Sequence, residues 1–239
     1  MKRGIARSVR LFKSFLVEQS DPHVFYSTLA QDSAELLAEH VALAGATVLD
    51  VGAGPQEFAE EFLARGARYV PVDRDQGAAS LAAGGLTADA HHLPIATGVI
   101  DVTFSSNLIE HVQEPSVVAD ELLRVTRPGG VVFISYTNWL SPWGGHETSP
   151  WHWLGGQRAI RRYTRKHGHA PKNRVGVNLF EVSVSWGLDW ARRRSASGEA
   201  IVVALRPRYL PDWCSVVLKV PFVRELVTWN LLILVRKAS

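Results

Sequence analysis

Apolar residues recur at helical spacing in the first part of the chain. Between residues 5 and 19 they are separated by lysine and arginine, and the apolar positions are Ile5, Val9, Phe12 and Leu16. This pattern predicts a basic amphipathic helix. A second helix is predicted over residues 28–43, where the apolar stripe consists of Leu29, Leu36, Leu37 and Val41. We expect residues 1–43 to form a helical cap on the rest of the protein.

The pattern changes after residue 43 to short β-rich runs. These runs are "ATVLDV", "ARYVPVD", "GGLTAD", "DVTFSS" and "GGVVFISY", and "RPGG" (Arg127 to Gly130) is predicted to be a turn before the last of them. Segments long enough for a helix separate them at residues 55–65, 74–82 and 108–127. Strands that alternate with helices indicate a parallel sheet with right-handed crossovers.

Two more strand-like runs, "AIVVALRPRYL" and "WNLLILVRK", lie near the end of the chain, and an apolar insert at 210–226 separates them. We expect these two runs to pair antiparallel. The fold class is therefore α/β: a Rossmann-like, mostly parallel sheet of seven strands with an antiparallel last strand and helices on both faces. Residues 44–137 form its core, 138–174 a Trp- and His-rich insertion over one sheet edge, and 175–239 the C-terminal part.

Composition narrows the class of protein. The chain has 239 residues, a net charge of +3 and a single cysteine, Cys214, which excludes a disulfide framework. The basic N-terminus lacks the apolar core of a signal peptide, and the run "LVTWNLLILV" is too short to span a bilayer as a helix. We expect a cytoplasmic protein, with peripheral contact to the inner face of the plasma membrane as an additional prediction.

The stretch "VLDVGAGPQEF" (Val48 to Phe58) places glycines directly after the first strand. In an open α/β sheet, ligands bind beyond the carboxyl ends of the strands. A dinucleotide loop would have a third glycine where this chain has Glu57. Asp50 would repel a pyrophosphate but attract an ammonium or sulfonium group. The loop therefore favours a nucleoside with a cationic tail.

Acidic residues follow the next two strands as well. Asp73 ends the second strand, about twenty residues after the glycines, where an acidic side chain can accept from both ribose hydroxyls. Asp89 ends the third, where it can accept from an exocyclic amine such as that of adenine. Alone, each could be a helix cap or a turn residue. Together they indicate a nucleoside site.

With these motifs in this order, residues 44–137 resemble the class I S-adenosylmethionine-dependent methyltransferases. The resemblance implies S-adenosylmethionine as cofactor and S-adenosylhomocysteine as product. It implies that the glycine loop holds the methionine part, and that Ser106 and Asn107 line the methyl-transfer side. Many members have glycine where this chain has Gln56. The implied cofactor-binding residues are Asp50, Gly52, Ala53, Gly54, Asp73, Arg74, Asp89, Ala90, Ser106 and Asn107.

The candidate catalytic residues are His146 and Glu147, which follow a Gly-Gly turn after the fifth strand. A histidine with a pKa near neutrality is suited to act as general base toward an oxygen acceptor. The alternative is a surface histidine on a loop. Glu110 and His111 resemble a recurring "EHV" of the family, and His111 is either a packed histidine or a catalyst.

The insertion also supplies candidate substrate-binding residues. Its tryptophans could enclose an apolar acceptor or pack the insertion onto the sheet. Residues 158–174 contain seven Lys or Arg, which could bind phosphate or carboxylate or form a solvated face. The histidines lack metal-ligand spacing, so no metal site is predicted. The substrate candidates are Trp139, Trp143, His152, Arg162 and His167.

The basic N-terminal helix and the apolar insert could both contact a membrane. "GGHE" and "RKHGHAPKN" are similar to a group of actinobacterial methyltransferases associated with envelope lipid metabolism. We therefore expect methyl transfer, on oxygen, to a small-molecule or lipid-linked acceptor. The alternatives are a nucleic-acid methyltransferase, which the balanced charge disfavours, a cofactor-binding module without turnover, and an NAD-dependent redox enzyme. The oligomeric state stays open.

Overall fold

The computed structural model describes residues 4–17, 20–79 and 84–239. Within these residues seven strands form one sheet in the order β3-β2-β1-β4-β5-β7-β6. Strand β7 is antiparallel to both neighbours, and the other pairs are parallel. The predicted fold class is thereby confirmed. The strands are β1 (Thr47–Val51), β2 (Arg68–Asp73), β3 (Leu86–Thr87), β4 (Ile100–Ser106), β5 (Thr126–Thr137), β6 (Ala200–Pro207) and β7 (Asn230–Lys237).

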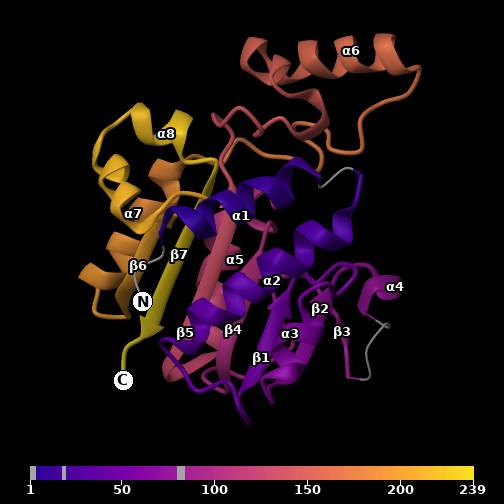
Figure 1. The fold of residues 1–239 in the computed structure, drawn as a ribbon. Helices are drawn as coiled ribbons and strands as arrows, with labels where there is room; N and C mark the ends of the chain where they lie inside the picture. Colours follow the sequence, from indigo (N-terminus) through magenta and orange to yellow (C-terminus); the bar gives the residue numbers. More distant parts are fainter. Residues whose placement is uncertain (1–3, 18–19, 80–83) are drawn as a thin grey trace.

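Helices cover both faces of the sheet, as predicted (Figure 1). Helices α1 (Ile5–Leu16), α2 (Pro22–Ala38) and α3 (Ala59–Ala64) pack on one face through a shared apolar core. Helices α5 (Pro115–Val125) and α7 (Val184–Ala196) pack on the other. Because both faces are covered, the central strands are apolar at successive positions, and neighbouring residues such as Val48 and Leu49 join opposite cores.

The remaining elements gather at the sheet end where the parallel strands finish (Figure 1). The insertion contains the 3-10 helices η2 (His146–Thr148) and η3 (Trp151–Leu154), followed by α6 (Gly156–His167). The later apolar insert forms η4 (Asp212–Lys219) and α8 (Val223–Val227). Two short elements, α4 (Gln76–Ala79) and η1 (Ile109–His111), follow β2 and β4.

Several predicted boundaries are wrong. The segment "RPGG" does not form a turn before β5 but belongs to this strand. Gly130 packs so closely against the Asp101 carbonyl that a Cβ atom would not fit, and the pairing of β5 with β4 continues through an irregular register. Helix α2 begins at Pro22 and ends at Ala38, not at 28 and 43, because the Asp21 side chain accepts from Val24 N and caps its start. Helix α7 has no counterpart in the sequence prediction.

Candidate functional site

The glycine loop leaves β1 at the point where the strand order reverses between β1 and β4. Gly52 and Gly54 have φ values of +81° and +47°, a region that favours glycine. A Cβ atom on Gly52 would lie 3.0 Å from Leu108, whereas one on Gly54 would meet nothing within 4 Å. Gly54 therefore exposes backbone toward open space at the switch point, where ligands of such sheets bind.

Gln56, where many class members have glycine, has a φ of +62°. The backbone thus adopts at Gln56 the left-handed conformation that glycine would favour. Gln56 in place of glycine therefore changes the residue, and the backbone at this position still has the left-handed conformation.

Asp73 ties the glycine loop to the end of β2. Its Oδ2 accepts from Gly54 N at 2.9 Å, and its Oδ1 accepts from Asp75 N at 2.9 Å. Asp50 lies beneath the loop, only 2% exposed, and accepts from the Tyr69 hydroxyl at 2.6 Å. Burial, together with nearby Asp73, raises the pKa of Asp50 to about 7, although the hydrogen bond from Tyr69 opposes this shift. Asp50 therefore supports the loop from within, and its direct contact with a ligand stays a prediction.

Asp89 lies two residues beyond β3, which ends at Thr87 and not at Asp89 as predicted, and its side chain is 57% exposed. Its carboxylate accepts from His91 N at 2.9 Å and contacts His91 Nδ1 at 2.6 Å. These hydrogen bonds, with Arg74 nearby, hold the pKa of Asp89 below its usual value. The carboxylate is therefore ionised at neutral pH and accessible, as an acceptor for an amine should be.

The end of β4 is held by the side chains of Asn230, the first residue of β7, and of Arg208, which follows β6. Asn107 has a φ of +58°, and its Oδ1 accepts from Asn230 Nδ2 at 2.9 Å. Ser106 Oγ accepts from Arg208 Nη1 at 2.9 Å. Sequence reasoning placed Ser106 and Asn107 here, but not Asn230 or Arg208. The pairing of β7 with β5 brings in Asn230, and no local pattern could predict that long-range neighbour.

Arg208 is a buried cation surrounded by hydroxyl groups. It donates to Ser135 Oγ and Ser33 Oγ, both at 2.6 Å, in addition to Ser106. Among the described residues no carboxylate lies within ion-pair distance of its guanidinium. Burial lowers the pKa of Arg208 to about 10. The sequence gives no local signal for this burial, since Arg208 lies beyond the apolar run 200–205 and follows another arginine and a proline.

Glu110, His111 and His146 meet beyond the ends of β4 and β5. One ligand atom from each lies within 4.8 Å of the others. The rings of His111 and His146 have centroids 5.2 Å apart, although one follows β4 and the other lies in the insertion. His146 has a φ of +49°, so the backbone is strained where its ring enters this cluster.

Two atoms of this cluster are buried without a partner: Glu110 Oε2 and His146 Nε2. Burial raises the pKa of Glu110 and lowers the pKa of His146 to about 4. His111, His152 and Lys172 contribute to this lowering of the pKa of His146. His146 is therefore neutral at pH 7 with its lone pair available, although an imidazole with so low a pKa is a weak base.

Glu147 points elsewhere. Its carboxylate accepts from Asn173 N at 3.4 Å and from Asn173 Nδ2 at 3.1 Å, which ties the start of the insertion to its end. Glu147 is thus bonded within the insertion, whereas its neighbour His146 joins the cluster. The sequence grouped the two as catalytic candidates because they are adjacent, and the turn of η2 separates their directions.

A pocket of about 500 Å³ lies beside the insertion. His152 is buried in its wall, with Nε2 at 3.0 Å from the Trp139 carbonyl oxygen. Burial lowers the pKa of His152, which favours the neutral ring. Gly145, next to His146, packs directly against the His152 ring. The pocket lining consists of Trp139, Leu140, His152, Trp153, Gly155, Glu181 and Leu226.

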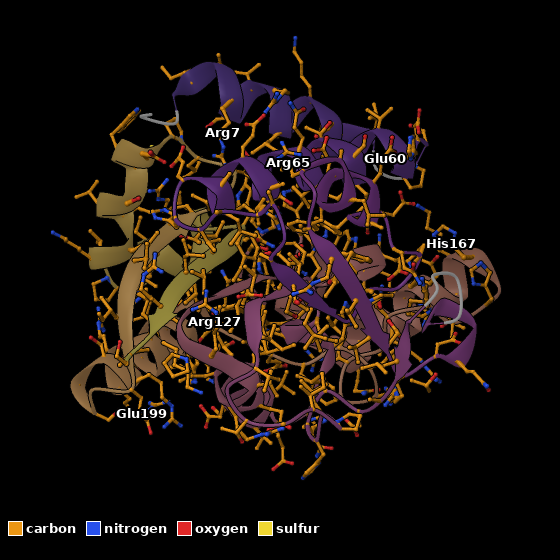
Figure 2. All side chains as sticks on the ribbon, turned by 90° about the horizontal axis from the view of Figure 1, so that it is seen from below. Arg7, Glu60, Arg65, Arg127, His167 and Glu199 are labelled. Atoms are coloured by element: carbon orange, nitrogen blue, oxygen red, sulfur yellow. The ribbon has the colours of Figure 1, made fainter. Side chains whose placement is uncertain are left out.

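The other substrate candidates do not line this pocket. Trp143 packs on α1, with its ring centroid 5.1 Å from that of Phe15. The guanidinium of Arg162 stacks 3.9 Å above the Trp151 ring. His167, at the end of α6, stacks on Tyr163 and lies at the periphery of the molecule (Figure 2).

Comparison with known proteins identifies the family. A model of the methyltransferase domain matches residues 49–134. An uncharacterized methyltransferase from Mycobacteroides abscessus is 45% identical over 249 residues, covering 97% of this chain and 94% of the relative. Another, from Mycobacterium sp. strain KMS, is 48% identical over 238 residues, covering 95% and 92%. The chain belongs to this methyltransferase family.

The fold agrees with this assignment. The solved S-adenosylmethionine-dependent methyltransferase from Mesorhizobium loti superposes with a TM-score of 0.55 at 17% identity, covering 84% of this chain and 95% of that one. The present methyltransferase accordingly uses S-adenosylmethionine as methyl donor. The loop fits that cofactor, since Gly54 faces open space, the carboxylates of Asp73 and Asp89 lie at the end of β2 and just beyond β3, and no third glycine prepares a pyrophosphate site.

Proposed function

We propose that this methyltransferase methylates a hydroxyl oxygen of an amphiphilic, lipid-linked acceptor at a membrane surface. The observation that supports this most strongly is the position of the pocket. Its wall at His152 packs against Gly145, the residue before His146, so a pocket with tryptophan walls lies next to a buried cluster of polar groups. An acceptor with one apolar and one polar end matches this pair of environments.

The chemistry needs few groups. The acceptor oxygen attacks the methyl carbon, an O–C bond forms, and the C–S bond of the sulfonium breaks to leave S-adenosylhomocysteine. Holding the oxygen in line with that bond supplies most of the rate. The hydroxyl proton must leave during the attack, and the unpartnered Nε2 of neutral His146 is our candidate for receiving it when no metal ion is bound there.

The surface at this end of the sheet supports a membrane location for the acceptor. Trp213 is 70% exposed on η4, and Phe222 is 84% exposed at the start of α8. Helix α6 exposes its cationic side chains, and it lies at the same end of the molecule (Figure 1). Exposed aromatic side chains beside lysine and arginine are typical of surfaces that bind anionic lipid. No helix within the described ranges is long and apolar enough to cross a membrane.

The acceptor is tested by incubating the protein with S-adenosylmethionine carrying a labelled methyl group and with separate lipid, small-molecule and RNA extracts from mycobacterial cells. We expect the label in the lipid fraction, in a product stable to mild base as an ether is. Label in RNA would instead support a nucleic-acid acceptor bound by α6. Label confined to the small-molecule fraction would exclude a lipid-linked acceptor.

The membrane contact is tested separately by co-sedimentation with vesicles of phosphatidylglycerol and phosphatidylcholine. The double variant Trp213→Ser/Phe222→Ser should bind these vesicles at least about tenfold more weakly, since both side chains would lose apolar burial in the interface. Val99→Ser is the matched control, because Val99 is 53% exposed and precedes the start of β4 at the opposite sheet end. Equal loss in both variants would contradict a membrane surface at η4 and α8.

A further inference from the structure

We propose that Glu110, His111 and His146 bind a divalent transition-metal ion, such as Zn²⁺, at the methyl-transfer side of this protein. The three residues each place one ligating atom within 4.8 Å of the others. Two imidazoles and one carboxylate form a donor set suited to a first-row divalent ion. In tetrahedral geometry, metal–ligand bonds of about 2.0–2.2 Å place two ligand atoms about 3.3–3.6 Å apart, so shifts of up to about 1.5 Å would close the site.

His111 is held in the orientation of a metal ligand. Its Nδ1 donates to the Asn178 carbonyl oxygen at 2.7 Å, which leaves the lone pair on Nε2. Ligating histidines commonly donate their second ring nitrogen to a carbonyl in this way, because the bond fixes both the tautomer and the ring angle.

Glu110 is likewise fixed with one oxygen left over. Its Oε1 accepts from Thr137 N at 2.9 Å, and its side chain is buried, while Oε2 has no partner. His146 Nε2, also buried, has none either. A buried polar atom without a partner destabilises the folded protein, and one ion between these two atoms would satisfy both.

From the sequence we predicted no metal site, because the spacing of four histidines is not that of metal ligands. These histidines are His146, His152, His167 and His169. Only His146 of these four belongs to the cluster. The other two ligands come from the turn after β4, and the insertion brings His146 onto them. The set is therefore assembled by tertiary structure.

This inference rests on the proposed function in one respect, the hydroxyl acceptor. Three protein ligands leave a coordination position open. An acceptor hydroxyl bound there would lose its proton to solvent more readily, and the resulting alkoxide would attack the methyl carbon as the C–S bond breaks. With the ion present, His146 is a ligand and not the base. Binding of the ion itself needs no acceptor.

The test is a titration of the chelator-treated full-length protein with Co²⁺, followed by displacement with Zn²⁺. We expect visible absorption that saturates at one equivalent and disappears on adding Zn²⁺. His111→Ala and Glu110→Gln should each weaken binding at least about tenfold. His169→Ala, which removes an exposed histidine outside the cluster, should leave binding unchanged. Calorimetric binding of S-adenosylhomocysteine by each variant shows that the fold is retained.

The outcomes separate the two proposals. Absence of a saturable signal, or equal binding by wild type and His111→Ala, would overturn the metal site whatever the acceptor is. Methyl transfer to lipid that is unaffected by chelation would also overturn it and leave the acceptor proposal standing. Saturable binding lost in both cluster variants supports the site, even if no lipid extract is methylated, in which case the acceptor proposal alone fails.

Discussion

The imidazole of His146 lies against that of His111, with ring centroids 5.2 Å apart, and this contact joins the insertion to the turn after β4. The segment that follows the insertion is held at the same turn, since Phe180 N donates to the Glu110 carbonyl oxygen at 2.8 Å. The insertion is thus fastened to the turn after β4, at the strand end where we expect the methyl group to be transferred.

The burial of His146 predicts acid sensitivity of the metal-free protein. Its pKa is lowered from 6.5 to about 4 in the folded state, so the unfolded state binds the extra proton between these values. Neutral His146 therefore contributes to the free energy of unfolding above pH 6.5. This contribution, about 3 kcal/mol in total, is lost as the pH falls toward 4. The free energy of unfolding can be measured with urea at about pH 7 and about pH 4.5. Its decrease between these pH values should be smaller by about 2 kcal/mol in His146→Asn than in wild type. His169→Asn should keep the wild-type difference, and an equal reduction in both would contradict the assignment.

Arg208 predicts a variant that loses function with little loss of stability. The fall of its pKa from 12.5 to about 10 corresponds to about 3 kcal/mol of unfavourable burial of the charge. Arg208→Met removes this cost together with three hydrogen bonds, so the free energy of unfolding should change by less than about 2 kcal/mol. Turnover should fall about tenfold, because Ser106 loses its donor at the methyl-transfer side.

A matched comparison exists in Arg7, whose guanidinium binds the buried Asp32 carboxylate through two nitrogens at 2.5 and 2.6 Å. Arg7→Met leaves that charge without this partner and should cost more than about 2 kcal/mol. Chemical denaturation of both variants checks the contrast. If Arg208→Met is the less stable of the two, Arg208 has a structural role.

The sheet could be predicted from the sequence because each strand carries a local signal. Runs such as "VVFI" (residues 131–134) are apolar at successive positions, as strands covered on both faces must be. Helix α7 was missed because its buried face is made partly of glycine and tryptophan: Gly187 leaves room for the Tyr136 hydroxyl, and Trp190 donates to Asp120 at 2.8 Å. Neither feature gives a regular apolar stripe.

A residue of the candidate site was predictable where its position depends on a single strand. The positions of Asp73, Asp89 and Asn107 follow from the strands that precede them. The cluster at Glu110 and the buried Arg208 were not predictable, because each depends on a contact between distant segments. The sequence analysis also grouped His146 with Glu147 because they are adjacent, but their side chains contact different partners.

The exposed carboxylate of Asp89 predicts a selective loss of cofactor binding. Asp89→Ala removes the expected acceptor for the adenine amine, and because the side chain is largely exposed it should leave thermal stability nearly unchanged. We expect S-adenosylhomocysteine to bind about tenfold more weakly in calorimetric titration, as loss of a hydrogen bond to a charged group costs about 1.5–3 kcal/mol. Asp189→Ala, an exposed carboxylate on α7, is the control. Unchanged affinity in Asp89→Ala would place the adenine elsewhere.

The pocket predicts that acceptor affinity can be altered without touching the cofactor. Leu226 is half-exposed at the pocket mouth and belongs to α8, opposite Trp139 and Trp153 of the insertion. Leu226→Trp adds an indole ring to this space, so the KM for a long-chain acceptor should rise about tenfold or more, since part of its apolar burial is lost. Leu226→Met keeps the volume and should leave KM unchanged, and calorimetry should give both variants the same affinity for S-adenosylhomocysteine. A KM that is equal in both variants, with normal cofactor binding, would show that the acceptor does not use this pocket and would leave the transfer itself unchallenged.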